Sequence, residues 1–387
     1  MSCKSYEEEL QLLIDKVEQV NDLDWVSVTE ELDLEMSPET LRKSFTGGRY
    51  GGYRVAKFYQ DKIENGILSS EEIENIKSAK DILYKERVRL QDARREYNKL
   101  LRHEARYENL VEVLKEAVEN VEPFEYIKHE YKYATNIHAA LLLSDIHYGL
   151  KIDNVLNEYN IDICKERMKL LLDKVIYFCQ LNRVEVLHVN LLGDIISGLI
   201  HLSARVANEE DVITQTIEVG EMLARFIHEL NQWVPQVKVY GCTGNHSRVT
   251  VDKKTNVPAE NFERLIFEYI RLRVPGIRMS LNGLEDWVSY KIKDKLVFAT
   301  HGDKDTVQNV KMHSVNLLKQ VPDVIYLGHI HHMNLRDDNG TEIITNGSIC
   351  SVDEYAMGNR LNTEPYQILQ IYGNDTLIYR LNLRDNR

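Results

Sequence analysis

Residues 324–332 read VIYLGHIHH, a short apolar run that ends in glycine and is followed by His329, His331 and His332. An apolar run of this length, bounded by glycine, is typical of a buried β-strand. Histidine is the commonest metal ligand among side chains, but it also occurs on protein surfaces without a role. Taken alone, the three histidines therefore do not distinguish a metal site from chance.

Four other apolar runs end in the same way, with polar side chains directly after them. These side chains are Asp145 and His147 after 138–144, Asp194 after 184–192, Asn245 and His246 after 237–242, and His301 after 295–300. A sixth run covers 342–347, and helical patterns lie near 162–180, 207–232, 259–272 and 305–320. The alternation predicts an α/β fold of packed sheets with flanking helices. Ligands gather at the carboxyl ends of strands in such folds.

The polar side chains after these runs form a coherent set of metal ligands. They combine carboxylate oxygens and imidazole nitrogens and include no thiolate, which suits Mn²⁺, Fe²⁺ or Zn²⁺ better than Ca²⁺. Seven ligands are too many for one tetrahedral ion and fit two ions that share a carboxylate. Two metals roughly 3.5–4 Å apart clamp the attacking and leaving oxygens in phosphoryl transfer, and a shared hydroxide would be the nucleophile.

The ordered motifs DxH, GD, GNH, H and GHxH within residues 138–350 resemble the calcineurin-like metallophosphoesterase superfamily. The resemblance implies a four-layer αββα sandwich with a dinuclear centre. It implies that Asp145, His147 and His331 bind one metal, that Asp194 bridges, and that Asn245, His301 and His329 bind the other. His246 would be the proton donor or transition-state stabiliser. Mn²⁺ is the first choice of metal, with Fe²⁺ or Zn²⁺ as alternatives.

Two positions depart from the pattern of many members of that superfamily. Ser247 stands where many have Asp after GNH, and Ser197 stands where many have Asp, Asn or His. The sequence therefore does not identify the partner that orients His246. The stretch GNHSR is similar to phage and prophage DNA repair exonuclease-like members, so Arg248 is a candidate phosphate contact.

Three further residues near the motifs have expected roles. His201 is a second candidate substrate contact, and for both His201 and Arg248 a supporting or surface role is the alternative. Asp303 is expected behind His301, where it would orient the ring. No role is expected for His332.

Residues 1–66 predict a small helical domain. Trp25, Val28 and Leu32 share one face of a first helix, and Ser37 is an expected N-cap with Pro38 at the first helical position of a second. Two helices with a short break resemble a helix-turn-helix. Basic residues mixed with aromatic residues and glycine suit a nucleic-acid contact; the candidates are Arg42, Lys43, Arg49, Arg54 and Lys57. The alternative is a bundle that binds protein or only packs.

Residues 67–125 predict a helical arm, and residues 126–387 the phosphoesterase domain. The arm has neither Gly nor Pro before Pro123, and its apolar residues follow a heptad that includes Leu83, Leu90 and Tyr97. This pattern favours a long helix or a helical hairpin with a coiled-coil seam, which could join two chains or pack within one. Its basic middle is either a solvated face or a DNA-contacting arm.

The composition limits the class of protein. Lys and Arg number 48 against 61 Asp and Glu, a formal charge of −13, which argues against a surface that coats nucleic acid all over. The five cysteines are scattered, as expected of reduced thiols. The acidic N-terminus lacks a secretory signal, and no apolar stretch is long enough to span a bilayer. The expected location is the cytoplasm of a bacterium or an infected host cell, without a membrane partner.

These expectations favour a DNA nuclease of the repair or phage-replication type. DNA is the expected partner, and a homodimer could form through the helical arm or the phosphoesterase domain. The alternatives are a phosphomonoesterase, a phosphodiesterase of small nucleotides, or a DNA-binding regulator or scaffold with an incidental phosphoesterase centre. A fold alone does not choose among these substrates.

Overall fold

The computed structural model of this chain describes residues 12–13, 15–16, 22–32, 37–46, 62, 65–66, 70–125, 135–200, 206–252, 260–281 and 286–384. The chain divides into two compact units, Met1–Arg102 and His103–Arg387. The division falls within one long helix, whereas the sequence places domain limits at 66 and 125. Those limits stay a prediction.

The first unit contains the two helices expected near its N-terminal end. Helix α2 covers Trp25–Glu31 and helix α3 covers Pro38–Thr46. Ser37 Oγ accepts a hydrogen bond from the backbone N–H of Thr40 at 3.2 Å, so the predicted N-cap is confirmed. Among the described residues of this unit, Leu13, Val28, Leu32 and Leu41 are buried together in a small apolar cluster.

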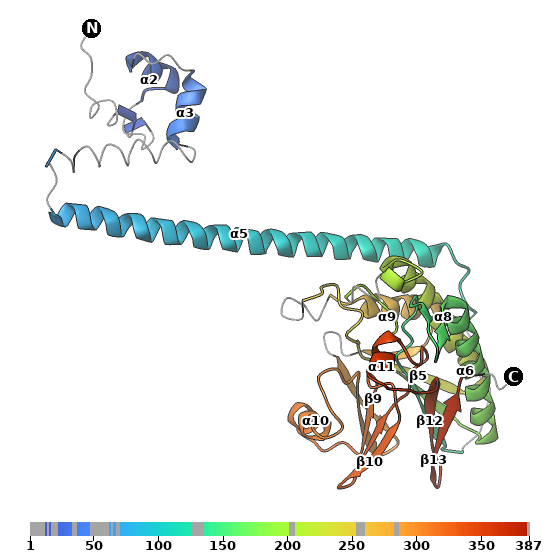
Figure 1. The fold of residues 1–387 in the computed structure, drawn as a ribbon. Helices are drawn as coiled ribbons and strands as arrows, with labels where there is room; N and C mark the ends of the chain where they lie inside the picture. Colours follow the sequence, from blue (N-terminus) through green and yellow to red (C-terminus); the bar gives the residue numbers. More distant parts are fainter. Residues whose placement is uncertain are drawn as a thin grey trace. The chain divides into compact units, whose positions relative to one another are not determined.

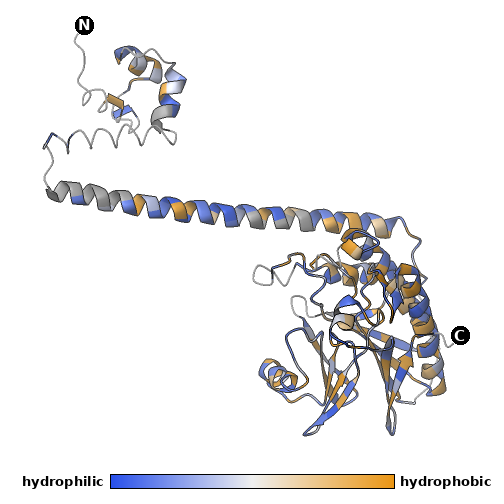
Figure 2. Ribbon diagram, in the orientation of Figure 1, coloured by the Kyte–Doolittle hydropathy of each residue, from blue (hydrophilic) through white to orange (hydrophobic). Residues whose placement is uncertain are grey.

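Helix α5 runs without a break from Ser70 to Glu119. Of the two forms expected for the arm, the long helix is therefore present and the hairpin is not. Side chains at 81–98 are all exposed, including Leu83, Leu90 and Tyr97, which are 70%, 70% and 61% exposed. Figure 2 shows apolar and polar residues mixed along this helix.

The C-terminal end of α5 is part of the core of the second unit. Leu114 is buried there, and Leu110, Val111 and Val118 pack against the same cluster. The seam of the heptad is thus used for packing at one end of the helix and exposed in its middle.

Two sheets form the framework of the second unit. The first has the order β13 (Thr376–Asn382), β12 (Tyr366–Tyr372), β1 (His138–Leu143), β4 (Val186–Leu191), β5 (Gln236–Gly241), β6 (Arg278–Leu281). The second has the order β10 (Asn334–Asp338), β11 (Thr341–Thr345), β9 (Val324–Leu327), β8 (Lys295–Thr300), β7 (Trp287–Ile292). Strands β1, β4, β5 and β6 are parallel, as are β8, β9 and β11.

All six strands expected from the sequence are present. The sequence did not predict β6, β7, β10, β12 and β13, nor the short pair β2 (Ile152–Asp153) and β3 (Glu158–Tyr159). Strand β12 matters most among these, because it pairs antiparallel with β1 and continues the first sheet beyond it.

Alternating side chains of the strands belong to different apolar clusters. Ala139, Leu141 and Leu143 of β1 pack in a cluster with helices α6 (Ile161–Leu181), α8 (Val212–Trp233) and α9 (Phe262–Arg273). Ala140 and Leu142 pack with residues of the second sheet. Helix α10 (Val310–Leu318) contributes Val310 to a third cluster with Phe298 and Ile325 of the second sheet. Both faces of β1 are therefore buried, which explains its continuous apolar run. Figure 1 shows α6 on the side of β12 and β13, and α10 on the side of β9 and β10.

Polar side chains cap the N-termini of the three long helices that pack with the first sheet. Asn160, Asp211 and Asn261 are the N-caps of α6, α8 and α9, and each accepts hydrogen bonds from the first helical turn. A short helix, α11 (Glu354–Gly358), precedes β12. Among the described residues, no helix combines the length and apolar character needed to cross a membrane.

Candidate metal centre

The eight residues expected at the centre lie in the five loops that follow β1, β4, β5, β8 and β9. Because β1, β4 and β5 are parallel, and β8 and β9 are parallel, these loops leave each sheet at its carboxyl edge. Asp145, His147, Asp194 and His301 are buried. The remaining four, Asn245, His246, His329 and His331, are partly buried.

Asp145, His147 and His331 form one group of donor atoms. Nε2 of His331 lies 3.2 Å from Oδ1 of Asp145, and Nε2 of His147 lies 3.3 Å from Nε2 of His331. The backbone N–H of His329 donates to Oδ2 of Asp145 at 3.1 Å and fixes the carboxylate. Two imidazole nitrogens and a carboxylate oxygen thus converge on one place.

Asn245, His301 and His329 form a second group. Nε2 of His301 lies 3.2 Å from Oδ1 of Asn245 and 3.2 Å from Nδ1 of His329. Nδ1 of His301 donates to the carbonyl oxygen of Leu192 at 2.7 Å, so in the neutral ring Nε2 carries the lone pair. Asp303 was expected to orient His301, and this was wrong, because the backbone of Leu192 takes that position.

Asp194 lies between the two groups. Its Oδ2 is 3.1 Å from Nε2 of His301 and 4.0 Å from Nε2 of His147. Its Oδ1 accepts the backbone N–H of His246 at 2.9 Å. One carboxylate oxygen therefore faces both groups, which is the position that a bridging ligand needs.

The charges of the centre favour a bound cation. Burial alone would lower the pKa of His301, but the carboxylate of Asp194 outweighs it and raises that pKa to about 10. Burial alone would raise the pKa of Asp194, but His301 and His246 hold that pKa well below its usual range. The pocket thus stabilises positive charge beside ionised carboxylates. Carboxylate oxygens and imidazole nitrogens are ligands that suit Mn²⁺, Fe²⁺ or Zn²⁺, so the residues present fit such ions.

The backbone of the centre is strained. Five of the seven expected ligands have positive φ angles: Asp145 at 54°, His147 at 49°, Asp194 at 50°, His329 at 69° and His331 at 55°. Residues other than glycine rarely adopt this left-handed conformation, and such strain collects at functional sites. The loops are therefore shaped to direct these side chains inward.

Two glycines allow the loops of Asp194 and Asn245 to lie against each other. A Cβ atom on Gly244 would lie 2.2 Å from the backbone nitrogen of Asp194, and one on Gly193 would lie 2.5 Å from that of Gly244. Gly193 also has a φ of +85°. The glycines of the GD and GNH motifs are thus required by this close approach.

His246 is oriented by the backbone. Its Nδ1 lies 3.1 Å from the carbonyl oxygen of Ser197, which can only accept, so Nδ1 is the donor. Its Nε2 lies 3.9 Å from Oδ2 of Asp194, on the side of the centre. The sequence did not identify the partner that orients His246, because serine stands at both 197 and 247. That partner is the main-chain carbonyl of Ser197. Ser247 instead donates to the carbonyl oxygen of Gly244 at 3.1 Å.

Glu263 is a residue that the sequence did not point to. This fully buried carboxylate accepts the backbone N–H of Ile195 at 2.7 Å and that of Gly244 at 2.6 Å. Ile195 and Gly244 adjoin Asp194 and Asn245, so Glu263 ties together the two loops that carry them. Burial, and then the charge of Asp194, raise the pKa of Glu263 to about 7.

The other candidate contacts have mixed positions. Arg248 is buried and donates to the carbonyl oxygen of Asn245 at 2.9 Å, which favours a supporting role. His332 is exposed, and its Nδ1 pairs with the carbonyl oxygen of Ile330 at 2.7 Å.

Of the candidate nucleic-acid contacts, Arg42 and Lys43 both pair with Glu39, at 2.7 and 3.3 Å. Outside the described residues lie His201, Arg49, Arg54 and Lys57.

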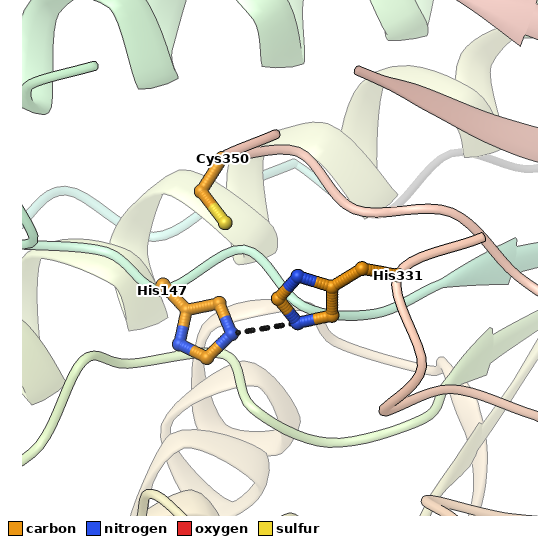
Figure 3. Close-up of side chains that lie close together, drawn as sticks. All are labelled: His147, His331 and Cys350. Atoms are coloured by element: carbon orange, nitrogen blue, oxygen red, sulfur yellow. Dashed lines mark hydrogen bonds between the residues drawn. The ribbon is translucent and has the colours of Figure 1, made fainter. Parts of the chain in front are cut away.

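The structure brings a cysteine to the centre, although the sequence indicated no thiolate. The sulfur of Cys350 and one ring nitrogen each of His147 and His331 all lie within 4.8 Å of one another. Figure 3 shows the sulfur directed toward the gap between the two rings. Cys350 lies after β11, the strand that corresponds to the predicted run 342–347. No ligand was assigned to that run from the sequence.

Comparison with known sequences finds two matches. Residues 82–121 match the family described as the YonJ coiled-coil domain. The chain is also 24% identical over 363 residues to the SPbeta prophage-derived uncharacterized protein YonJ of Bacillus subtilis (strain 168), covering 87% of this chain and 86% of that protein.

Solved structures with a similar arrangement include phosphoesterases and Vps29 proteins. A novel archaeal phosphodiesterase is 16% identical, with a TM-score of 0.34 over 62% of this chain and 99% of that one. Vacuolar protein sorting 29 of Cryptosporidium parvum is 15% identical, with a TM-score of 0.35 over 65% and 94%. A predicted phosphoesterase of Streptococcus pneumoniae TIGR4 is 10% identical, with a TM-score of 0.28 over 63% and 98%.

Proposed function

We propose that this protein is a two-metal phosphoesterase that hydrolyses phosphodiester bonds, and that its substrate is DNA. The observation that carries the proposal is the position of Asp194. Its Oδ2 faces His301 at 3.1 Å and His147 at 4.0 Å, between two separate groups of donor atoms. Paired metal sites that share a carboxylate serve phosphoryl transfer.

Each group of donors would hold one divalent ion. Asp145, His147 and His331 would bind the first, Asn245, His301 and His329 the second, and Asp194 both. When bound, the two ions supply Lewis-acid activation of the phosphate ester and of the attacking water. Mn²⁺ is the first choice for the two ions, with Fe²⁺ or Zn²⁺ as alternatives.

His246 acts in this proposal as the proton donor to the leaving oxygen. The carbonyl oxygen of Ser197 accepts from Nδ1, so Nε2, which lies 3.9 Å from Oδ2 of Asp194, is the atom that would carry the transferred proton, in the doubly protonated ring. A ring fixed in this way needs no reorientation during the reaction, which is what general acid catalysis requires of its donor.

The architecture and the N-terminal helices support the finer parts of the proposal. Three successive apolar clusters fit a four-layer αββα metallophosphoesterase sandwich. Helices α2 and α3 fit a helix-turn-helix, and α5 carries Arg87, Arg89, Arg94 and Arg95 on exposed positions. A basic surface on an acidic chain suits a DNA backbone. The exposed Leu83, Leu90 and Tyr97 support a homodimer through α5.

A panel of substrates tests the proposal. Purified protein with Mn²⁺ is incubated with single-stranded, double-stranded and nicked DNA, RNA, p-nitrophenyl phosphate and cyclic nucleotides. We expect DNA cleavage that EDTA abolishes and that Asp194→Asn lacks. Efficient hydrolysis of the small esters with every DNA form intact would replace the nuclease with a small-molecule phosphoesterase. A DNA-linked cellular role that survives Asp194→Asn but not loss of residues 1–66 would favour a scaffold.

A further inference from the structure

Cys350 differs from the other buried cysteines in what its sulfur faces. It belongs to the cluster with His147 and His331, whose three ligand atoms lie within 4.8 Å of one another. Zinc is tetrahedral and binds histidine nitrogen at about 2.0–2.1 Å and cysteine sulfur at about 2.3 Å, so a nitrogen and a sulfur that share one ion lie about 3.6 Å apart. The sulfur reaches that separation if the cluster contracts by up to about 1.2 Å on binding the ion.

The backbone around Cys350 is held firmly on several sides. The N–H of Ile349 donates to the carbonyl oxygen of Asp145 at 3.0 Å, which joins this loop to the loop of the first expected ligand. The guanidinium of Arg167 donates to the carbonyl oxygens of Ile349 and Cys350 at 2.6 and 3.2 Å, and the amide of Asn157 donates to that of Cys350 at 2.8 Å. The sulfur is therefore presented to the histidines by a fixed loop.

The two imidazole nitrogens of the cluster are spaced for one ion. Nε2 of His147 lies 3.3 Å from Nε2 of His331, the separation of two nitrogens that share a tetrahedral zinc at about 2.0–2.1 Å each. The thiol of Cys350 donates a long hydrogen bond, 3.6 Å, to the carbonyl oxygen of Ser351.

We propose that the sulfur of Cys350 is an additional ligand of the ion held by Asp145, His147 and His331, and that it makes this position selective for thiophilic ions such as Zn²⁺ and Co²⁺ over Mn²⁺. The inference rests on the proposed function because it needs an ion at this position. Thiolate is a soft ligand that zinc accepts and that hard oxygen-seeking ions avoid. Binding of the sulfur releases the thiol proton to solvent.

The second position has a different set of donors. Asp194, Asn245, His301 and His329 supply oxygen and nitrogen alone, which retains the preference for Mn²⁺ or Fe²⁺ there. The centre would therefore hold two different ions, and the identity of the first would be set by one cysteine.

Spectroscopy of the full-length protein tests this without relying on activity. The metal-free protein is titrated with Co²⁺ while its near-ultraviolet absorption is recorded. We expect a sulfur-to-cobalt charge-transfer band that is absent from Cys350→Ser and present in Cys179→Ser, which alters another buried cysteine. The Zn²⁺ affinity of Cys350→Ser should be at least about tenfold lower than that of wild type, because mutation of a residue that only supports a ligand already costs that much. The Mn²⁺ affinity should not change.

The outcomes separate this inference from the proposed function. If wild-type protein binds Co²⁺ without the band, or Cys350→Ser keeps it, Cys350 is only a core residue and the dinuclear centre still stands. If no Co²⁺, Zn²⁺ or Mn²⁺ binds, both proposals fail. If Cys350→Ser does not fold, X-ray absorption of the Zn²⁺-loaded wild type decides, because a sulfur shell at about 2.3 Å is either present or absent.

Discussion

Nδ1 of His246 lies 3.1 Å from the main-chain carbonyl oxygen of Ser197, three residues after the expected bridging carboxylate. A backbone atom therefore fixes the orientation and the tautomer of the ring. The sequence pattern had suggested a side-chain partner instead. The hydroxyl of Ser197 is not used in this contact. It is buried, and it has no hydrogen-bond partner among the described residues.

Ser197→Ala is therefore expected to leave catalysis unchanged and to keep or raise stability. A buried hydroxyl without a partner costs desolvation energy, on the order of 1–3 kcal/mol, and alanine removes it. Phosphodiesterase rates and the thermal midpoint of the variant are compared with wild type. A large fall in kcat would mean that the hydroxyl, and not the carbonyl, orients His246.

His246→Ala is expected to lower kcat by about 10²- to 10⁴-fold, the usual contribution of a positioned acid or base. Metal content should not change, because His246 belongs to neither group of ligands in the proposal. Single-turnover rates and metal analysis measure the two effects. His332→Ala is the matched control, since His332 is exposed and pairs with its own loop, and its activity should stay close to wild type.

Glu263→Gln is expected to weaken metal binding and the fold together. The glutamine amide can accept only one of the two N–H groups that Glu263 holds, so the N–H of Ile195 or Gly244 is left unpaired at a cost of about 1–3 kcal/mol. Loss of such a support lowers metal affinity by about 10- to 100-fold. Mn²⁺ titration and thermal melting measure both.

The control on the same helix is Glu268→Gln. The side chain of Glu268 is 47% exposed and pairs with Arg271 at the surface, so removal of its charge should change neither quantity. Equal behaviour of the two variants would show that Glu263 does not position the loops.

Gly244→Ala is expected to abolish metal binding. Its Cβ would lie 2.2 Å from both the backbone nitrogen and Oδ1 of Asp194, and a backbone atom cannot move aside cheaply. Gly358→Ala is the matched control, because nothing lies within 4 Å of its added Cβ and its φ is not positive. Metal analysis and circular dichroism compare the two. Normal metal content in Gly244→Ala would contradict the close approach of the two loops.

Deletion of residues 1–66 is expected to weaken DNA binding and to spare hydrolysis of a small phosphodiester. The affinity of the full chain should fall steeply with salt, in proportion to the number of phosphates contacted, and the slope should become shallower after deletion. Binding titrations at several salt concentrations measure this. An unchanged slope would show that residues 1–66 do not belong to the proposed DNA surface.

The positions of the expected ligands could be predicted from sequence because each follows a local signal. An apolar run that ends in Asp, Asn or His gives both the strand and the donor, and parallel pairing brings the strand ends together. All six predicted strands carry an apolar run, and five of the runs are followed by a donor. Strand β10, with the sequence NLRDD, is mostly polar and largely exposed and gives no such signal.

Glu263 and Cys350 could not be assigned by motif, because their partners are backbone groups or lie far along the chain. A signal for Glu263 was nonetheless present. It stands on the same helical stripe as the buried Ile266, Phe267 and Ile270, where a carboxylate is unexpected unless it has partners. For Cys350 the signal was its place after the sixth predicted strand. Tertiary contact, and not local pattern, gives both residues their proposed roles.

The left-handed backbone of five ligands has an evolutionary consequence. Each such residue costs roughly 1–2 kcal/mol relative to an ordinary conformation, and glycine would relieve it. Selection for heat resistance alone would therefore favour replacing Asp145 or His147 by glycine and would erode the centre. If the proposed function is correct, descendants of this chain that have lost it are expected to gain glycine at these positions. In the absence of metal they should melt at a higher temperature than this chain.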